Sequence, residues 1–247
     1  MTKVYIRYPE YVLSLNMNAV ITGATKGIGK AIAKLLATKG YNLAVCARNK
    51  HELDDVVAEM STYGVQVIAL VADCRQKSEV KSFLKHIQLN MATIDVLVNN
   101  VGVFLPGNLL DETDDDFEIQ QQVNLNAAYY LSKELGNRMR QQGFGHIFDI
   151  CSIAAIDRTQ SAASYTVTKA AMHSLNHVLR KELAPHGVKV TAILPGATLT
   201  HSWSGTTIPP DVFIQPEDVA DMVYAIMKLS AGANVDEVIL TPLHFNH

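Results

Sequence analysis

The 247-residue sequence predicts an α/β fold with a doubly wound parallel sheet of about seven strands and helices on both faces. Short apolar runs alternate with longer segments whose apolar residues recur at helical spacing. Such alternation is typical of parallel strands joined by right-handed crossovers. The short runs are apolar throughout, as expected for strands that helices cover on both faces. A glycine-rich turn follows the first run, where folds of this class bind their ligands.

Each predicted element follows from its apolar pattern and from the residues at its ends. Asn49 is a candidate N-cap for a helix, and Gly40 and Gly64 stand where helices end. The predicted strands span residues 18–22, 43–46, 65–71, 94–98, 146–150, 188–194 and 235–240. The predicted helices span residues 28–39, 53–60, 78–90, 115–142, 163–184 and 216–230.

We expect a single catalytic domain over residues 17–247, preceded by an N-terminal extension over residues 1–16. The extension contains charged residues and a proline, so it lacks the apolar core of a secretory signal. Met17 stands directly before the first predicted strand, which favours a start assigned too early or a loosely held segment. An added edge strand over residues 4–6 is the alternative, because these residues have β propensity.

The composition excludes several classes of protein. A net charge of −3 leaves no basic excess for a nucleic-acid partner. No apolar run reaches the length that spans a membrane. The cysteines Cys46, Cys74 and Cys151 are odd in number and widely spaced, which favours a reducing, cytoplasmic setting over a disulfide framework.

The turn between the first strand and the first helix has the sequence TGATKGIG over residues 22–29. Glycines let a backbone turn sharply and approach a diphosphate, and a helix N-terminus offers free N–H groups to it. The G-x-x-x-G-x-G spacing resembles the short-chain dehydrogenase/reductase family, from about residue 18 onward. The resemblance implies a Rossmann-type domain with a nicotinamide cofactor, bound here by Gly23, Thr25, Lys26, Gly27, Ile28 and Gly29.

The end of the second strand predicts which nicotinamide cofactor binds. An NAD enzyme usually places a carboxylate there for the ribose hydroxyl, but this strand ends in Ala47 and Arg48. Arg48 can form a forked contact with a 2′-phosphate, and Lys26 matches a second basic position in NADP-preferring relatives. We therefore expect NADP(H), with two solvated surface cations as the alternative interpretation.

Further cofactor contacts follow from the resemblance. Asp73 and Cys74 follow the third strand and correspond to the family's adenine-contacting segment, although Asp73 could instead cap the next helix. The segment Asn100, Val101 and Gly102 corresponds to the stretch beside the adenine ribose. The resemblance places the nicotinamide carboxamide beside four residues after the sixth strand, namely Pro195, Gly196, Thr198 and Thr200.

Four residues form the candidate catalytic set. Tyr165 and Lys169 lie four residues apart on a predicted helix and therefore on one face of it. A tyrosine hydroxyl can donate a proton to a carbonyl oxygen, and a nearby ammonium stabilises the resulting phenolate. Ser152 lies thirteen residues before Tyr165, the family's usual spacing, and can bond the same substrate oxygen. The resemblance gives Asn124 a role in linking the lysine to solvent, whereas a solvated helix position is the alternative.

Two clusters are interpreted as structural rather than metal-binding. His173 and His177 lie four apart on the predicted 163–184 helix, but the spacing shows no third ligand, which favours surface or interface residues. The acidic run at residues 114–116 follows Thr113 at a predicted helix start, where carboxylates interact favourably with the helix dipole. We therefore expect no metal site.

These features predict an NADP(H)-dependent oxidoreductase that transfers a hydride between nicotinamide and the carbonyl or alcohol carbon of a small molecule. Reduction of a 3-oxoacyl thioester is the best-supported reaction by analogy, whereas the ending Leu240 to His244 looks more like relatives that act on other small carbonyls or hydroxy amino acids. An NADP-sensing regulatory or scaffold protein on the same fold is the alternative.

Two further predictions concern the assembly of subunits and a segment over the candidate site. Apolar faces on the helices over residues 115–142 and 163–184 predict a homodimer or homotetramer, as the family forms. The segment over residues 200–215 contains Trp203 and follows the predicted nicotinamide contacts, so we expect a mobile lid. A surface loop whose tryptophan packs on the body of the protein is the alternative.

Overall fold

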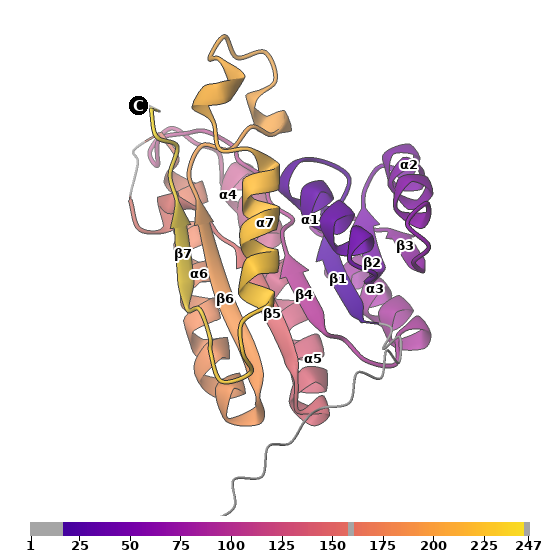
Figure 1. Cartoon of the computed structure of the whole chain (residues 1–247). Coiled ribbons are helices and arrows are strands. Elements are labelled where there is room, and N and C mark those ends of the chain that lie inside the picture. Colours follow the sequence, from indigo (N-terminus) through magenta and orange to yellow (C-terminus); the bar gives the residue numbers. More distant parts are fainter. Residues whose placement is uncertain (1–16, 158–160, 245–247) are drawn as a thin grey trace, which may run out of the picture.

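A computed structural model describes residues 17–157 and 161–244, which contain one seven-stranded sheet (Figure 1). Every strand pair is parallel, and the order across the sheet is β3-β2-β1-β4-β5-β6-β7. The predicted doubly wound α/β fold is therefore confirmed. The strands are β1 (Asn18–Thr22), β2 (Asn42–Ala47), β3 (Val67–Val71), β4 (Val96–Asn99), β5 (Gly145–Ile150), β6 (Val188–Pro195) and β7 (Glu237–Leu240).

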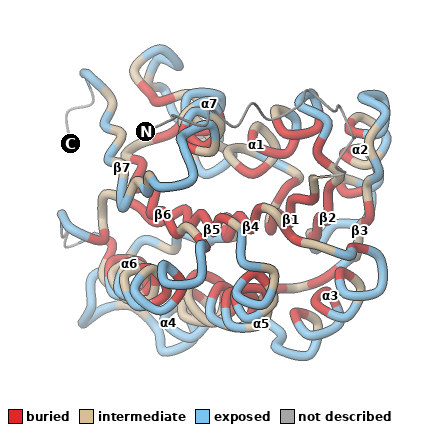
Figure 2. Tube along the Cα trace, turned by 60° about the horizontal axis from the view of Figure 1, so that its bottom comes forward, coloured by how far each residue is buried: buried red, intermediate tan, exposed pale blue. Residues whose placement is uncertain are grey.

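The helices form one layer on each face of the sheet, and the buried residues concentrate between the layers (Figure 2). The central strands β1 and β4 are buried because side chains of both faces pack against helices, which explains their uninterrupted apolar runs, whereas the edge strands β3 and β7 are partly exposed. One layer contains α1 (Gly27–Thr38), α2 (Lys50–Ser61) and α7 (Pro216–Met227). The other contains α3 (Lys77–Asn90), α4 (Asp114–Gln121), α5 (Ala127–Gln142) and α6 (Ala163–Leu183).

The order of the strands reverses between β1 and β4. After β1 the chain adds β2 and β3 on one side, and it then returns to place β4 on the other side of β1, with Val20 opposite Leu97. The connections that leave β1 and β4 therefore run to opposite sides. Such a reversal leaves a crevice at the carboxyl ends of the strands, which is where ligands of this fold class bind.

The helix predicted over residues 115–142 is interrupted by a π-helical turn, Gln122–Asn126, between α4 and α5. A period estimated from apolar residues cannot resolve one wider turn within a long helix, so the sequence pattern missed it. The start of α4 matches the predicted cap. Thr113 and Asp116 form a reciprocal capping box there, and this confirms a structural role for the acidic run.

The other element ends differ from the predictions by a few residues. β7 begins at Glu237 rather than residue 235, and β4 begins at Val96 rather than residue 94. Hydrogen bonding to the neighbouring strand sets these ends. The apolar runs in the sequence do not show where this hydrogen bonding begins. Asn49 caps α2 as predicted, since its side chain accepts the Glu52 N–H at 3.2 Å.

The interpretations of residues 1–16 concern a segment outside the described residues. Within the described parts of the chain, no helix combines the length and the apolar character needed to cross a membrane.

Candidate active site

A cavity of about 1200 Å³ opens at the carboxyl ends of the strands, at the reversal between β1 and β4. Small-molecule pockets usually occupy roughly 300–1,000 Å³, so this cavity can hold a dinucleotide together with a small second ligand. Its wall combines the turn before α1, the ends of several strands and the start of the segment between β6 and α7.

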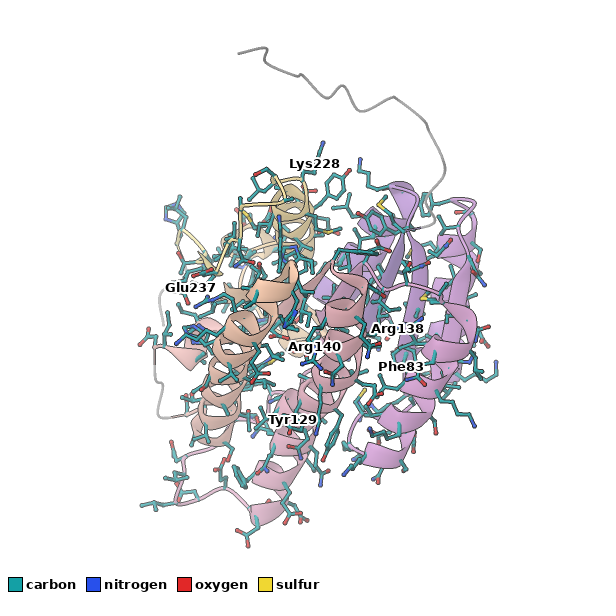
Figure 3. The ribbon with its side chains drawn as sticks, turned by 90° about the horizontal axis from the view of Figure 1, so that it is seen from below. Phe83, Tyr129, Arg138, Arg140, Lys228 and Glu237 are labelled. Atoms are coloured by element: carbon teal, nitrogen blue, oxygen red, sulfur yellow. The ribbon has the colours of Figure 1, made fainter. Side chains whose placement is uncertain are left out.

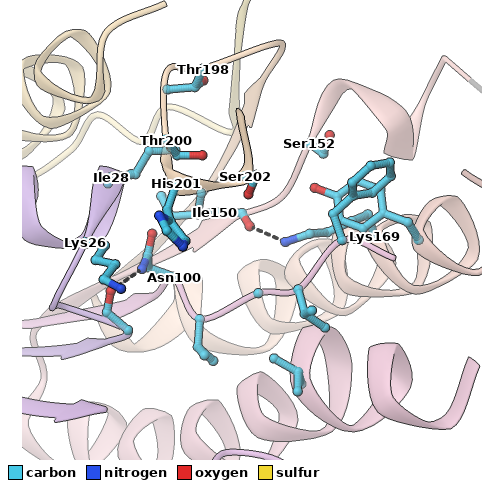
Figure 4. Close-up of a pocket in the computed structure, with 18 of the residues that line it drawn as sticks. Lys26, Ile28, Asn100, Ile150, Ser152, Lys169, Thr198, Thr200, His201 and Ser202 are labelled. Atoms are coloured by element: carbon cyan, nitrogen blue, oxygen red, sulfur yellow. Dashed lines mark hydrogen bonds between the residues drawn. The ribbon is translucent and has the colours of Figure 1, made fainter. Parts of the chain in front are cut away.

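Most of the predicted site residues lie on this wall, although they come from segments far apart in the chain. Figure 4 shows Ser152 and Lys169 on one side of the pocket and Lys26 and Asn100 on the other. Gly29 and Asn124 are predicted site residues that do not line the cavity. Those that do are Gly23, Thr25, Lys26, Gly27, Ile28, Arg48, Asp73, Cys74, Asn100, Val101, Gly102, Ser152, Tyr165, Lys169, Pro195, Gly196, Thr198 and Thr200.

The turn before α1 forms a cradle for an anion. Gly23 and Gly27 have positive φ angles of 66° and 53°, which side chains other than glycine rarely adopt. A Cβ on Gly27 would lie 3.0 Å from the Thr200 methyl across the cavity. Among the described residues no side chain caps α1, and its first turn contains no carboxylate. Its first N–H groups therefore remain available to a phosphate.

Gly29 acts through packing rather than through the cavity wall. A Cβ there would lie 2.3 Å from both the Asn100 side-chain nitrogen and the Gly23 carbonyl oxygen. Asn100 uses that nitrogen to donate to the Thr22 and Gly23 carbonyls, at 2.9 and 3.0 Å. The absence of a side chain at Gly29 thus lets Asn100 hold the glycine turn in shape.

The cationic corner of the cavity contains a carboxylate that the sequence analysis missed. The Lys26 ammonium lies 2.8 Å from a carboxylate oxygen of Glu52, which also lines the cavity beside Arg48. The hydrogen bond from Lys26 lowers the pKa of Glu52 below its ordinary value. Glu52 lies in the first turn of α2, where a carboxylate is expected for helix reasons alone, so its sequence position gave no functional signal.

Asp73 lies on the adjoining wall, held by its neighbour Arg75. Its carboxylate accepts the Arg75 backbone N–H at 3.0 Å and pairs with the Arg75 guanidinium at 2.6 Å. Burial opposes ionisation of Asp73, but the hydrogen bonds from Arg75 outweigh it and lower the pKa. The N-cap of α3 is Gln76, so the alternative that Asp73 caps this helix is wrong. Cys74, next along the chain, is buried with a free thiol.

The candidate catalytic side chains meet where β5 and α6 approach each other. The Lys169 ammonium donates to the Ile150 carbonyl at 2.8 Å and lies 5.8 Å from the centre of the Tyr165 ring (Figure 4). The Tyr165 ring makes an edge contact with Phe104, with 5.0 Å between centroids. Ser152 Oγ accepts the Ala154 N–H at 3.2 Å, which leaves the hydroxyl proton as a donor.

Asn124 is buried in the π-helical turn, so the alternative of a solvated helix position is wrong. Its amide accepts the Val103 N–H at 2.8 Å and donates to the Val103 carbonyl at 3.0 Å and to Thr168 Oγ1 at 3.1 Å. A Cβ on Gly102 would lie 3.4 Å from both Asn124 Oδ1 and the Lys169 ammonium. Asn124 therefore fixes the loop that brings Phe104 to Tyr165.

A buried carboxylate beneath the site ties its elements together. Asp149 of β5 accepts hydrogen bonds from the Asn99 amide at 2.7 Å and from the Asn176 amide at 2.8 Å. Complete burial raises the pKa of Asp149, and the two amide donors act in the opposite direction. Because Asn176 belongs to α6, this cluster anchors the helix of Tyr165 and Lys169 to the strand that ends in Ile150. No local sequence pattern indicates this cluster, since its members are distant in the chain.

The segment between β6 and α7 stands above the carboxyl ends of the strands (Figure 1). His201, Ser202 and Trp203 line the cavity, and the Trp203 ring also packs on Phe213 with 4.9 Å between centroids. Phe213 belongs to the same segment, so this contact lies within it, and the mobile lid stays a prediction. Two backbone hydrogen bonds close the base of the segment, from the Leu199 N–H to the Ile214 carbonyl at 2.8 Å and from the Ile214 N–H to the Ala197 carbonyl at 3.1 Å.

Comparisons with known proteins agree with this architecture. The model of the short chain dehydrogenase family matches residues 17–208. An uncharacterized oxidoreductase of Staphylococcus aureus (strain MRSA252) is 34% identical over 226 residues, which cover 91% of this chain and 96% of the relative.

Solved structures are similar as well. An alcohol dehydrogenase of the archaeon Thermococcus sibiricus, complexed with 5-hydroxy-NADP, aligns with a TM-score of 0.87 at 28% identity, covering 94% of this chain and 98% of the other. An L-sorbose reductase of Gluconobacter frateurii, complexed with NADPH and L-sorbose, aligns with a TM-score of 0.85 at 25% identity, covering 92% and 95%. Family match, relatives and parallel sheet agree: the chain belongs to the short-chain dehydrogenase/reductase family and is an oxidoreductase.

Proposed function

We propose that this oxidoreductase transfers a hydride between NADP(H) and the carbonyl or alcohol carbon of a small molecule. The observation that carries the proposal is the convergence of Tyr165, Ser152 and Lys169 on the wall of a cavity that also contains the glycine turn. A proton donor, an oxygen-binding hydroxyl and an ammonium thus face the space next to a phosphate cradle.

The cofactor proposal rests on the shape and charge of the cradle. The uncapped N-terminus of α1 and the glycine turn suit a diphosphate, while Lys26 and Arg48 suit a 2′-phosphate. The relatives complexed with NADP or NADPH support the same assignment. NADPH, when bound, supplies the hydride.

In the direction of reduction, the substrate oxygen lies between the hydroxyls of Ser152 and Tyr165. Ser152 donates a hydrogen bond to it, because Ser152 Oγ already accepts the Ala154 N–H. Tyr165 transfers its hydroxyl proton to this oxygen as the carbon receives the hydride, which gives the alcohol and a phenolate. Oxidation of an alcohol follows the same path in reverse.

Lys169 stabilises the phenolate by its positive charge, and the phenolate regains its proton from solvent before the next turnover. The Ile150 carbonyl holds the ammonium in place, and Tyr165 lies one helical turn away. Asn124 acts as a positioning residue in this proposal, because it contacts Val103 and Thr168 rather than the cavity. The loop it holds keeps Phe104 against the Tyr165 ring.

The remaining cavity wall favours small carbonyl compounds with an apolar part. Phe104, Ile119, Val123 and Trp203 contribute apolar surface to it. The solved relatives named above are an alcohol dehydrogenase and an L-sorbose reductase, which also act on small alcohols and ketones. A 3-oxoacyl thioester belongs in the same test panel.

A second copy of the chain is the proposed partner, in a homodimer or homotetramer. Tyr129 of α5 and Val167 and Val178 of α6 are exposed, and these side chains on adjacent helices are the surface that a second subunit would cover (Figure 3 labels Tyr129). A monomer mass by light scattering at micromolar concentration would contradict this.

An NADPH-oxidation assay over a panel of ketones, aldehydes and a 3-oxoacyl thioester tests the proposed function. We expect turnover with at least one carbonyl, and a loss of roughly 10²–10⁴-fold in Tyr165→Phe with NADPH binding retained. NADPH binding without turnover of any panel member would favour the sensor alternative. Near-normal turnover in Tyr165→Phe would show that another group supplies the proton.

A further inference from the structure

Three potential metal ligands converge between α6 and the edge strand β7, away from the residues that line the main cavity. His173 and His177 lie one turn apart on α6, and Glu237 is the first residue of β7 (Figure 3 shows Glu237 beside this helix). His173 Nε2 lies 2.9 Å from Glu237 Oε2 and 3.2 Å from His177 Nε2, and the third side of the triangle, from His177 Nε2 to Glu237 Oε2, measures 3.9 Å.

The size of this triangle matches the coordination shell of a small divalent cation. Zinc binds imidazole nitrogen and carboxylate oxygen at about 2.0–2.2 Å, so two ligand atoms at a tetrahedral angle stand about 3.3 Å apart. The three separations bracket that value. Surface pairs such as His51 and Asp55, 3.1 Å apart, offer two ligand atoms, whereas here a third arrives from a different element.

The hydrogen-bonding geometry and the nearby charges of the cluster also suit a metal. His173 Nε2 faces both Glu237 Oε2 and His177 Nε2, and an imidazole N–H on this nitrogen can point directly at only one of the two atoms. The Arg180 guanidinium is itself paired with Asp236 at 3.2 Å, which limits its repulsion of a cation.

The cluster combines rigidity with access. His173 and His177 are inside a long helix and Glu237 is in a strand, so the ligands need little reorganisation. The His173 side chain is 16% exposed, while those of His177 and Glu237 are each 44% exposed. An ion can therefore enter from solvent, and water can complete its coordination.

We propose that His173, His177 and Glu237 bind a divalent transition-metal ion of the zinc class. Two imidazoles and one carboxylate favour zinc, nickel or copper over magnesium. The bound ion would link the helix that carries Tyr165 and Lys169 to β7, at the edge of the sheet. This site is separate from the proposed catalytic chemistry and does not depend on it.

Titration of the untagged, metal-free protein with Zn²⁺ alone, followed by calorimetry and by thermal unfolding, tests the proposal. We expect one saturable Zn²⁺ per chain, a raised Tm with Zn²⁺ but not with Mg²⁺, and a more than about tenfold weaker affinity in His177→Ala and Glu237→Gln. His51→Ala, which removes a histidine from a two-ligand surface pair, is the matched control and should bind as the wild type does.

Co²⁺ provides a second readout that needs no variant. Tetrahedral coordination by the three side chains and water gives intense visible absorption, whereas Co²⁺ held loosely with its water shell gives only weak bands. Weak bands, absence of saturable Zn²⁺ binding, or equal affinity in wild type, His177→Ala and Glu237→Gln would each overturn the site. NADPH oxidation by the metal-free protein is measured separately, so failure of the metal site leaves the proposed function intact.

Discussion

The Lys26 ammonium and the Glu52 carboxylate form an ion pair of 2.8 Å on the wall of the candidate active site. Both side chains are partly exposed, so the pair itself adds little to stability. Its consequence concerns the cofactor. A 2′-phosphate that binds Lys26 must compete with Glu52 and also lies near its negative charge. We therefore expect Glu52 to limit the preference for NADPH that we propose for Lys26 and Arg48.

Glu52→Gln is expected to tighten NADPH binding several-fold and to change NADH binding little, because NADH has no 2′-phosphate to be repelled. Arg48→Asp should have the opposite effect and raise the dissociation constant for NADPH far more than that for NADH. Cofactor fluorescence titration measures both constants. The matched control is Glu59→Gln, which removes the two ion pairs of Glu59 with Lys30 and Lys34, all outside the cavity. Equal effects of Glu52→Gln on both cofactors would contradict the proposed phosphate position.

Lys169→Ala is expected to weaken NADPH binding by roughly 10–100-fold and also to remove most turnover, because the family resemblance implies that the ammonium holds the nicotinamide ribose in addition to stabilising the phenolate. Tyr165→Phe should affect turnover alone. Binding constants and single-turnover rates, measured side by side for the two variants, separate these roles. A Lys169→Ala protein that binds NADPH as tightly as the wild type would show that the lysine has no part in cofactor binding.

Trp203 is the sole tryptophan of the chain and lies on the cavity wall, so it reports on this region. Its fluorescence should change when NADPH and a substrate analogue bind together, if the segment over residues 200–215 closes over them. Trp203→Ala should raise KM with little loss of stability, whereas Trp203→Phe should keep the ring contact with Phe213 and a KM closer to that of the wild type. An unchanged spectrum together with a normal KM in Trp203→Ala would exclude a lid.

His146 of β5 should make the protein sensitive to acid. Burial lowers its pKa from 6.5 to about 3, and the charge of Lys189 contributes in the same direction. The unfolded chain binds a proton below pH 6.5 and the folded chain does not until about pH 3, so this contribution to stability is complete above pH 6.5 and declines as the pH falls. At pH 5 the loss is about 2 kcal/mol.

His146→Gln provides the test, because glutamine can still donate to Thr191 Oγ1, which lies 2.9 Å from His146 Nε2, and does not titrate. Urea unfolding at pH 7 and pH 5 should show that the wild type loses about 2 kcal/mol more than the variant over this interval. Parallel losses in the two proteins would mean that His146 is protonated without cost in the folded state.

Local patterns in the sequence were sufficient to predict several parts of this molecule. The order of strands and helices, the glycine turn and the spacing of Tyr165 and Lys169 are all set by residues within a few positions of one another. Backbone conformation and helical period act over that same range, so these features can be read along the chain. The cap of α4 by Thr113 belongs with them.

Other features depended on which elements the sheet brings together. Glu52 reaches Lys26 because α1 and α2 pack on the same face, and Asp149 contacts Asn99 and Asn176 through neighbouring elements. The π-helical turn that buries Asn124 is stabilised by its contacts with Val103 and Thr168, which no local pattern contains.

The metal-binding cluster proposed on α6 also depends on both local sequence and tertiary structure. Helical spacing placed His173 and His177 on one face, but their partner Glu237 is 60 or more positions further along the chain and belongs to the edge strand β7. The sequence determined the local conformation of each element, because that depends on neighbouring residues. Tertiary structure decided which charges and ligands meet, because the parallel order of the strands places residues from distant segments within hydrogen-bonding distance.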